Sequence, residues 1–166
     1  MHTIEVFSAW LKSTELSAAI LHYTWVWPTL EILHFVGMAF LVGFIGLLDF
    51  RMLGIGKGLP MGGLNKLIPW GVAGFVVNVV TGFLFYTGDP DQYLHNPAFQ
   101  FKMLFLVIAG LNVAYFYVGG VLARVEALGP ADDAPLSAKI VAGVSLTAWI
   151  AVMYCGRMLP YLGNAF

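Results

Sequence analysis

Four stretches of the chain contain no Asp, Glu, Lys or Arg, and each is long enough to cross most of a bilayer. These stretches are 17 to 22 residues long, and they cover residues 32–48, 67–88, 103–123 and 140–156. A helix rises about 1.5 Å per residue, so each stretch covers most of a roughly 30 Å hydrocarbon core. Backbone groups find no water partner in lipid, which makes helix the expected structure. The pattern predicts membrane-spanning helices near residues 29–49, 66–87, 98–123 and 138–159.

Residues 1–27 precede the first predicted span and follow a different pattern. Lys12 interrupts the apolar character, and the three tryptophans of this segment suit the headgroup level, where amphipathic rings settle. Pro28 is tolerated in the first turn of a helix and marks the start of the next element. We therefore predict an all-α fold. An amphipathic interfacial helix over residues 1–27 precedes a four-transmembrane-helix bundle over residues 28–166.

Composition supports an integral membrane protein and excludes several other classes. Hydrophobic residues make up 60% of the chain and charged residues 10%, whereas a soluble domain carries about 25% charged residues. Disordered chains are polar and charge-rich, so disorder is excluded as well. The net charge of −1 provides no basic field for nucleic acid. A single cysteine, Cys155, allows no internal disulfide and no zinc or iron–sulfur spacing.

Loop charges predict how the bundle is oriented. The loops after the first and third spans together contain five basic residues, and the opposite side of the bundle contains three. The positive-inside rule places these two loops in the cytoplasm and both termini on the periplasmic face of a bacterial inner membrane. Loop 50–65 is rich in glycine and is expected to be flexible, and loop 124–137 is expected to be a solvated turn.

Asn78 and Asn112 lie close to the middle of the second and third charge-free stretches. The two helices are expected to be antiparallel neighbours, so each amide could supply the hydrogen bond that the other needs. Gly74, Asn78 and Gly82 also form a stripe that favours close helix packing. A structural link between helices, worth roughly 0.6–2 kcal/mol, is the favoured interpretation. A contact with a substrate is the alternative.

Three ionisable residues are predicted near the periplasmic boundary of the membrane. Glu31 and His34 share one face of the first span, and Arg157 lies at a depth comparable to that of Glu31 on the fourth. An ion pair between Glu31 and Arg157 would reduce the cost of placing two charges there. The same arginine could instead hold an anionic group such as a haem propionate.

The four histidines all fall on the predicted periplasmic side, and only His34 lies inside a charge-free stretch. Imidazole ligates haem iron or copper and relays protons, and four-helix bundles commonly hold haem. A b-type haem on His34 would need a second ligand, because no other predicted span contains a histidine. The candidates are His22, His95, Met103 and Met158. A hydrogen-bonded core histidine is the alternative without chemistry, and copper held by His34 with Met103 and Met158 is another.

Three stretches of the chain resemble a family of uncharacterised bacterial four-helix membrane proteins: LHFVGMAFLVGFIGLLDFRMLG, TGFLFYTGDPDQYLHNPAFQFKMLFLVIAGLN and GRMLPY. More distantly, they resemble the membrane domain of CopD-type copper-resistance proteins. The resemblance implies the four-helix fold. It also implies that certain residues occupy the family's polar positions: His34, Asn96, Pro97, Lys102, Asn112 and Arg157. Relatives often have a histidine late in the third helix, where this chain has Tyr115, Phe116 and Tyr117.

Three functions remain open from the sequence. The first is a small redox module that holds a b-type haem near the periplasmic face and exchanges electrons with quinone or a periplasmic partner. The second is an accessory subunit, without a cofactor, of a larger respiratory or photosynthetic complex. Assembly into a homo-oligomer is also left open. The third is copper handling at the outer face. No nucleophile–base pair points to an enzyme of another kind.

Overall fold

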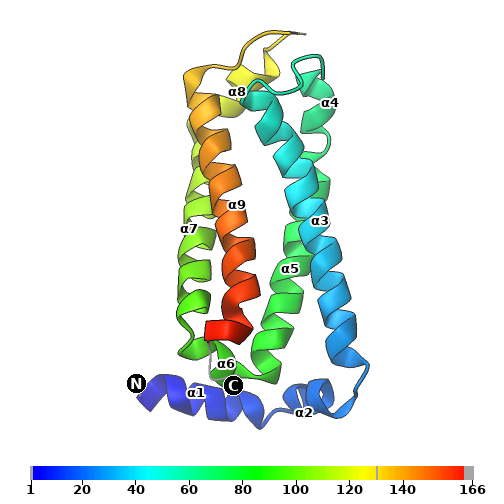
Figure 1. The fold of residues 1–166 in the computed structure, drawn as a ribbon, viewed down its shortest axis with the longest axis vertical. Coiled ribbons are helices and arrows are strands. Elements are labelled where there is room, and N and C mark those ends of the chain that lie inside the picture. Colours follow the sequence, from blue (N-terminus) through cyan, green and yellow to red (C-terminus); the bar gives the residue numbers. More distant parts are fainter. Residues whose placement is uncertain (1, 130, 163–166) are drawn as a thin grey trace.

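The computed structural model describes residues 2–129 and 131–162, and the side chains among them from Glu5 onward. These residues form nine helices and no strand, which confirms the predicted all-α fold (Figure 1). The helices are α1 (His2–Lys12), α2 (Glu15–His22), α3 (Val26–Met52), α4 (Met61–Asn65), α5 (Ile68–Gly88), α6 (Pro90–Leu94), α7 (Pro97–Val118), α8 (Val121–Glu126) and α9 (Leu136–Leu162).

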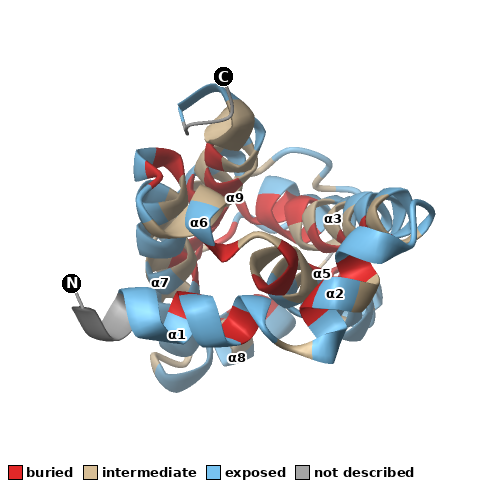
Figure 2. Cartoon of the chain, turned by 90° about the horizontal axis from the view of Figure 1, so that it is seen from below, coloured by how far each residue is buried: buried red, intermediate tan, exposed pale blue. Residues whose placement is uncertain are grey.

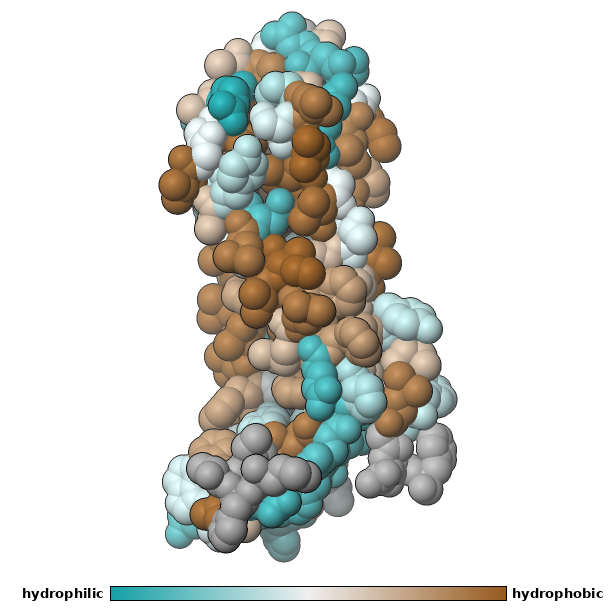
Figure 3. All heavy atoms as spheres, turned by 90° about the vertical axis from the view of Figure 1, so that its left-hand side faces the viewer, coloured by the Kyte–Doolittle hydropathy of each residue, from teal (hydrophilic) through white to brown (hydrophobic). Residues whose placement is uncertain are grey.

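The four long helices α3, α5, α7 and α9 are long and apolar enough to cross a membrane. Only 11% to 39% of the residues in the apolar windows of these spans are buried inside the protein. Most of their apolar side chains therefore face outward, as lipid contact requires. Apolar side chains cover most of the middle of the face shown in Figure 3, and hydrophilic ones gather at its two ends. The chain is a multi-pass membrane protein.

The bundle consists of two helical hairpins. Helix α3 packs mainly on α5, α7 packs mainly on α9, and the two pairs meet chiefly through α3 and α9 (Figure 2). The first hairpin is closely packed at two glycines. A Cβ atom added to Gly74 would lie 2.5 Å from the carbonyl oxygen of Gly37, so only glycine permits this approach.

The third span is shorter than the pattern predicted. Helix α7 ends at Val118, whereas the sequence predicted a helix to residue 123. Gly120 takes a left-handed conformation with φ of 66°, which costs glycine little and other residues more. The chain turns there into α8, which lies across one end of the bundle (Figure 1). We call this end, with α4 and α8, the α8 end, and the opposite end, with α1, α2 and α6, the α1 end.

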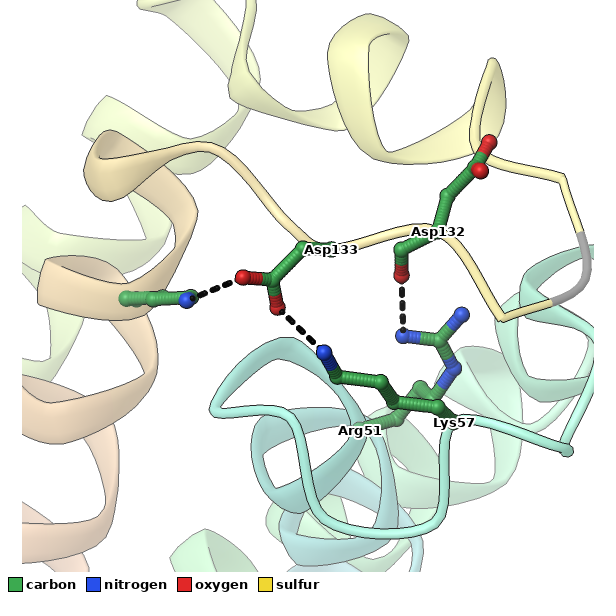
Figure 4. A network of polar contacts seen from close by, with 5 residues as sticks. Arg51, Lys57, Asp132 and Asp133 are labelled. Atoms are coloured by element: carbon green, nitrogen blue, oxygen red, sulfur yellow. Dashed lines mark hydrogen bonds and ion pairs between the residues drawn. The ribbon is translucent and has the colours of Figure 1, made fainter.

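A buried arginine joins the two loops at the α8 end. The side chain of Arg51 is completely buried. Its Nε donates to the carbonyl oxygen of Leu59 at 3.0 Å, and a terminal nitrogen donates to the carbonyl oxygen of Asp132 at 3.2 Å (Figure 4). The two loops, predicted to be a flexible turn and a solvated turn, are thus in contact through Arg51, and much of both remains exposed. The guanidinium supplies donors to one backbone carbonyl oxygen in each loop.

Asp133 reinforces this junction at its surface. Its carboxylate binds Lys57 of the first loop at 3.1 Å and Lys139 of α9 at 2.9 Å (Figure 4). Hydrogen bonds from Lys139 and Lys57 lower the pKa of Asp133 below its usual value. Both pairs are solvent-exposed, so each contributes little to stability by itself.

The N-terminal segment forms two helices, where the sequence predicted one. Thr14 separates α1 from α2, and its hydroxyl accepts a hydrogen bond from the backbone N–H of Ser17. An N-cap of this kind starts a new helix. Both helices lie across the α1 end of the bundle (Figure 2). The segment is thus docked on the bundle and packs through α2 on α5.

A single carboxylate attaches α1 to α6. Asp91 accepts a hydrogen bond from the hydroxyl of Ser8 at 2.7 Å and forms an ion pair with Lys12. Hydrogen bonds from Lys12 and Ser8 lower the pKa of Asp91. The neighbouring Tyr93 is affected in the opposite direction. Burial raises its pKa to about 12, with a smaller effect from the negative charges of Asp89 and Glu31.

Two polar residues of α7 and its cap face α9. Asn96 caps α7 by accepting from the backbone N–H of Ala98 at 2.9 Å, and its amide donates to the carbonyl oxygen of Leu159 at 2.8 Å. The ammonium group of Lys102 lies beside Gly156, 3.7 Å from where a Cβ atom would be. The second hairpin is therefore joined by polar contacts at the α1 end.

Candidate functional site

His34 lies between α3 and α5, half-buried, about two turns into α3. Its Nδ1 is 2.7 Å from the hydroxyl oxygen of Thr81, and that hydroxyl donates to the carbonyl oxygen of Val77, also at 2.7 Å. In the tautomer in which the hydroxyl keeps its bond to Val77, Nδ1 of His34 donates to the hydroxyl oxygen. The ring also meets the edge of Phe85, with 5.7 Å between centroids. The second nitrogen, Nε2, keeps its lone pair, which is the arrangement seen in metal-ligating histidines.

The hydrogen bond and the ring contact of His34 are made with Thr81 and Phe85, and not with its predicted partners. His22 and His95 are exposed on the short helices of the α1 end. Met103 is 46% exposed on the surface of the bundle, and Met158 is half-buried on α9. Among the described residues, no group of three or more His, Cys, Asp or Glu is placed to hold a metal ion. A haem or copper ion on His34 stays a prediction, and so does the identity of its second ligand.

The predicted ion pair between Glu31 and Arg157 is not formed. Glu31 is exposed on α3, and the ion pairs found among residues 2–129 and 131–162 do not include it. Arg157 instead donates to the hydroxyl of Tyr161 at 3.3 Å and lies 5.6 Å from the centre of that ring. A tyrosine one turn further along the same helix supplies a closer partner than a residue of another helix.

The predicted link between Asn78 and Asn112 is wrong. The amide of Asn78 donates to the carbonyl oxygen of Gly74 in its own helix at 3.1 Å, and the Oδ1 of Asn78 has no partner. The amide of Asn112 donates to the carbonyl oxygen of Val141 on α9 at 3.0 Å. The hairpins pair α3 with α5 and α7 with α9, so the link runs between α7 and α9.

This geometry predicts different consequences for the two asparagines. Replacing Asn112 with Leu should lower the stability of the protein by about 1 kcal/mol, because the contact between α7 and α9 loses its hydrogen bond. Replacing Asn78 with Leu should change stability less, since it removes no bond between helices. Thermal unfolding in detergent measures both effects. Equal losses in the two variants would contradict the assignment.

A cavity of about 240 Å³ lies between the hairpins, toward the α8 end. All four long helices contribute to its walls, which are mostly apolar. Its aromatic lining includes Phe75, Phe116 and Trp149, and its polar side chains include Asp49, Asn112 and Ser145. The nearest α3 residue of the lining, Leu41, is seven residues beyond His34, or about 10 Å along the helix. The cavity and His34 are therefore separate features.

Asp49 is the most unusual residue of this cavity. Only 2% of its surface is exposed, and its Oδ2 has no hydrogen-bond partner. The hydroxyl of Ser145, on the facing helix α9, interacts with the carboxyl group. Burial of a carboxyl oxygen without a partner is costly, so such groups need an explanation. An ionisable residue in a span is by default a candidate functional residue.

The exposed part of the cavity lining lies on two of the four helices. The lining residues of α3 and α9 are buried or half-buried, whereas several of those on α5 and α7 are exposed. The exposed ones are Val72, Phe75, Gly110, Val113 and Tyr117. Helices α5 and α7 are also the long helices that the hairpin pairing leaves without close contact. The opening therefore lies between α5 and α7 and faces the lipid.

Asp49 directly follows the charge-free stretch 32–48, so in the sequence it looks like a residue at the membrane boundary and not like a buried one. A helical pattern was nevertheless present. Leu41, Ile45, Leu48 and Met52 form the buried stripe of α3, and Asp49 lies on that same stripe. A carboxylate among apolar residues at spacings of three and four is the pattern that identifies it.

Comparisons with known proteins add no further information about this site. No family model, no curated protein and no solved structure matches the chain.

Proposed function

We propose that the protein binds a small membrane-soluble molecule in the cavity between its two hairpins. One observation carries the proposal: an apolar cavity is lined by Asp49, which has a buried carboxyl oxygen without a partner, and the exposed part of the lining lies on α5 and α7. Binding sites in membrane proteins commonly combine apolar walls with a few polar groups that orient the ligand. The ligand would enter sideways from the bilayer.

The size of the cavity limits the ligand. A cavity of about 150 Å³ lined by Leu, Ile and Phe is large enough to bind benzene. The volume here, about 240 Å³, suits one substituted ring with a tail that leaves between α5 and α7. A quinone headgroup has these properties. The cavity therefore supports the quinone part of the redox hypothesis and says nothing about its haem.

The remaining sequence-based hypotheses stand beside this proposal. A b-type haem on His34 predicts a Soret band that is lost in His34→Ala. The binding proposal does not depend on this haem. An accessory role in a larger complex predicts stable co-purification with that complex. The excess of basic residues in the loops of the α8 end supports a cytoplasmic α8 end and periplasmic termini in a bacterial inner membrane.

Filling the cavity tests the proposal. Gly110 lines the cavity, and a Cβ atom there would meet nothing within 4 Å. A Gly110→Leu variant should fold and should bind para-butylanisole, an aromatic ring without a hydrogen-bond donor, at least tenfold more weakly than the unchanged protein, with about 1.4 kcal/mol lost per factor of ten. Equilibrium binding of the tritiated probe to protein in lipid nanodiscs measures this, with empty nanodiscs as the reference.

Gly43→Leu is the matched control. A Cβ atom at Gly43 also meets nothing within 4 Å, but Gly43 does not line the cavity. This variant should bind the probe as the unchanged protein does. Absence of specific binding to the unchanged protein, or equal binding to both variants, would overturn the proposed function.

A further inference from the structure

The polar residues of the cavity wall also indicate which hydrogen-bonding group the ligand carries. We propose that the ligand is an aromatic alcohol, a phenol or quinol, whose hydroxyl group donates a hydrogen bond to the buried carboxyl group of Asp49 beside Ser145. This inference rests on the proposed function, because it assigns the ligand class for the same cavity.

The carboxyl group of Asp49 accepts a donor in either of its protonation states. An ionised carboxylate has two acceptor oxygens, and a protonated carboxyl group keeps acceptor capacity. Oδ2 is buried and without a partner. Because Oδ2 is not accessible from the cavity as it stands, the carboxyl group must rotate for a ligand hydroxyl to reach it. The hydrogen bond formed then removes the cost of leaving this oxygen unpaired.

The second polar group of the cavity points to the same chemistry. The amide nitrogen of Asn112 already donates to the carbonyl oxygen of Val141. Its side-chain oxygen is a pure acceptor. The polar lining at Asp49 and Asn112 is therefore rich in acceptors, and a ligand that brings a donor complements it better than one that brings only a carbonyl oxygen.

The walls favour a flat ring over an alkyl alcohol. Phe75 of α5 and Trp149 of α9 meet edge to face, with centroids 6.0 Å apart and an interplanar angle of 68°. Both line the cavity, and Phe116 lines it from α7. Aromatic groups prefer edge-to-face and offset contacts with one another, so an aromatic ligand gains contacts here that an aliphatic chain does not.

A matched pair of probes tests the inference. Para-butylphenol and para-butylanisole differ only in replacing the hydroxyl hydrogen by a methyl group. We expect the unchanged protein in nanodiscs to bind the phenol at least about tenfold more tightly, with both concentrations referred to the lipid phase. Asp49→Leu should still bind the anisole and should reduce the preference to near one. Asp49→Asn keeps an acceptor oxygen and should retain part of the preference.

The control variant is Glu31→Gln, which changes an exposed carboxylate of the same helix outside the cavity and should leave the preference intact. Equal affinity of the unchanged protein for phenol and anisole would overturn the inference while leaving the proposed function in place. A preference that persists in Asp49→Leu would also overturn it. Failure of both probes to bind specifically would overturn the proposed function itself.

Discussion

Replacing Gly74 with Ala should destabilise the protein by about 3 kcal/mol, near the upper end of the cost of overpacking. The new Cβ atom would lie 2.5 Å from the carbonyl oxygen of Gly37, 2.8 Å from the backbone nitrogen of Leu41 and 2.9 Å from Cβ of Phe40. Two of these atoms belong to the backbone of α3 and the third is fixed to it, so none can rotate away. The helices α3 and α5 must separate, and contacts along the hairpin are lost. Thermal unfolding in detergent measures the change.

The same exchange at Gly43 provides the control. Nothing lies within 4 Å of a Cβ atom there, and alanine favours helix over glycine by about 1 kcal/mol. Gly43→Ala should therefore be neutral or slightly stabilising. If Gly74→Ala melts like Gly43→Ala, the close approach of α3 and α5 is not present in the membrane protein.

Replacing Arg51 with Leu should cost a similar amount, about 3 kcal/mol, for a different reason. The variant removes a fully buried side chain and leaves the carbonyl oxygens of Leu59 and Asp132 without these donors. These two hydrogen bonds connect the loop after α3 to the loop before α9. Protease cleavage in residues 53–60 should become faster, and the melting temperature should fall.

Two further variants separate the guanidinium from its charge. Arg51→Lys preserves the charge but reaches one carbonyl at most, so its stability should lie between those of the unchanged protein and Arg51→Leu. Arg124 is exposed and bonds one carbonyl within its own segment, so Arg124→Leu should change stability little. Equal effects of Arg51→Leu and Arg124→Leu would show that the loops are not joined through Arg51.

The spans were predictable because lipid imposes one strong rule on the backbone. Uncharged stretches of this length must be helical, and α3, α5 and α9 begin and end within about three residues of the expected limits. The third span ends earlier than predicted, because Gly119 and Gly120 permit a turn that cannot be recognised from hydropathy alone. The division of the N-terminal segment at Thr14 depended on a cap, which the apolar pattern does not register either.

The polar contacts were less predictable, because they depend on which helices are neighbours. Antiparallel order along the chain suggested that Asn112 faces the helix of Asn78. The structure pairs the helix of Asn112 with α9 instead, so the amide finds a backbone carbonyl at Val141. Asp49 was overlooked for the same reason. The sequence pattern places it among apolar residues of α3, and the facing helices add that no donor reaches Oδ2.

The position of the opening, between α5 and α7, means that a ligand enters the cavity from the lipid phase and not from water. A ligand that arrives through the lipid competes with acyl chains and not with water, and its occupancy follows its mole fraction in the bilayer. A molecule concentrated in this thin layer fills a site of modest intrinsic affinity. Extraction into excess detergent would dilute it and empty the site, so a purified protein would lose a ligand that it holds in the cell. Under the proposed function, the protein would respond to the composition of its own membrane.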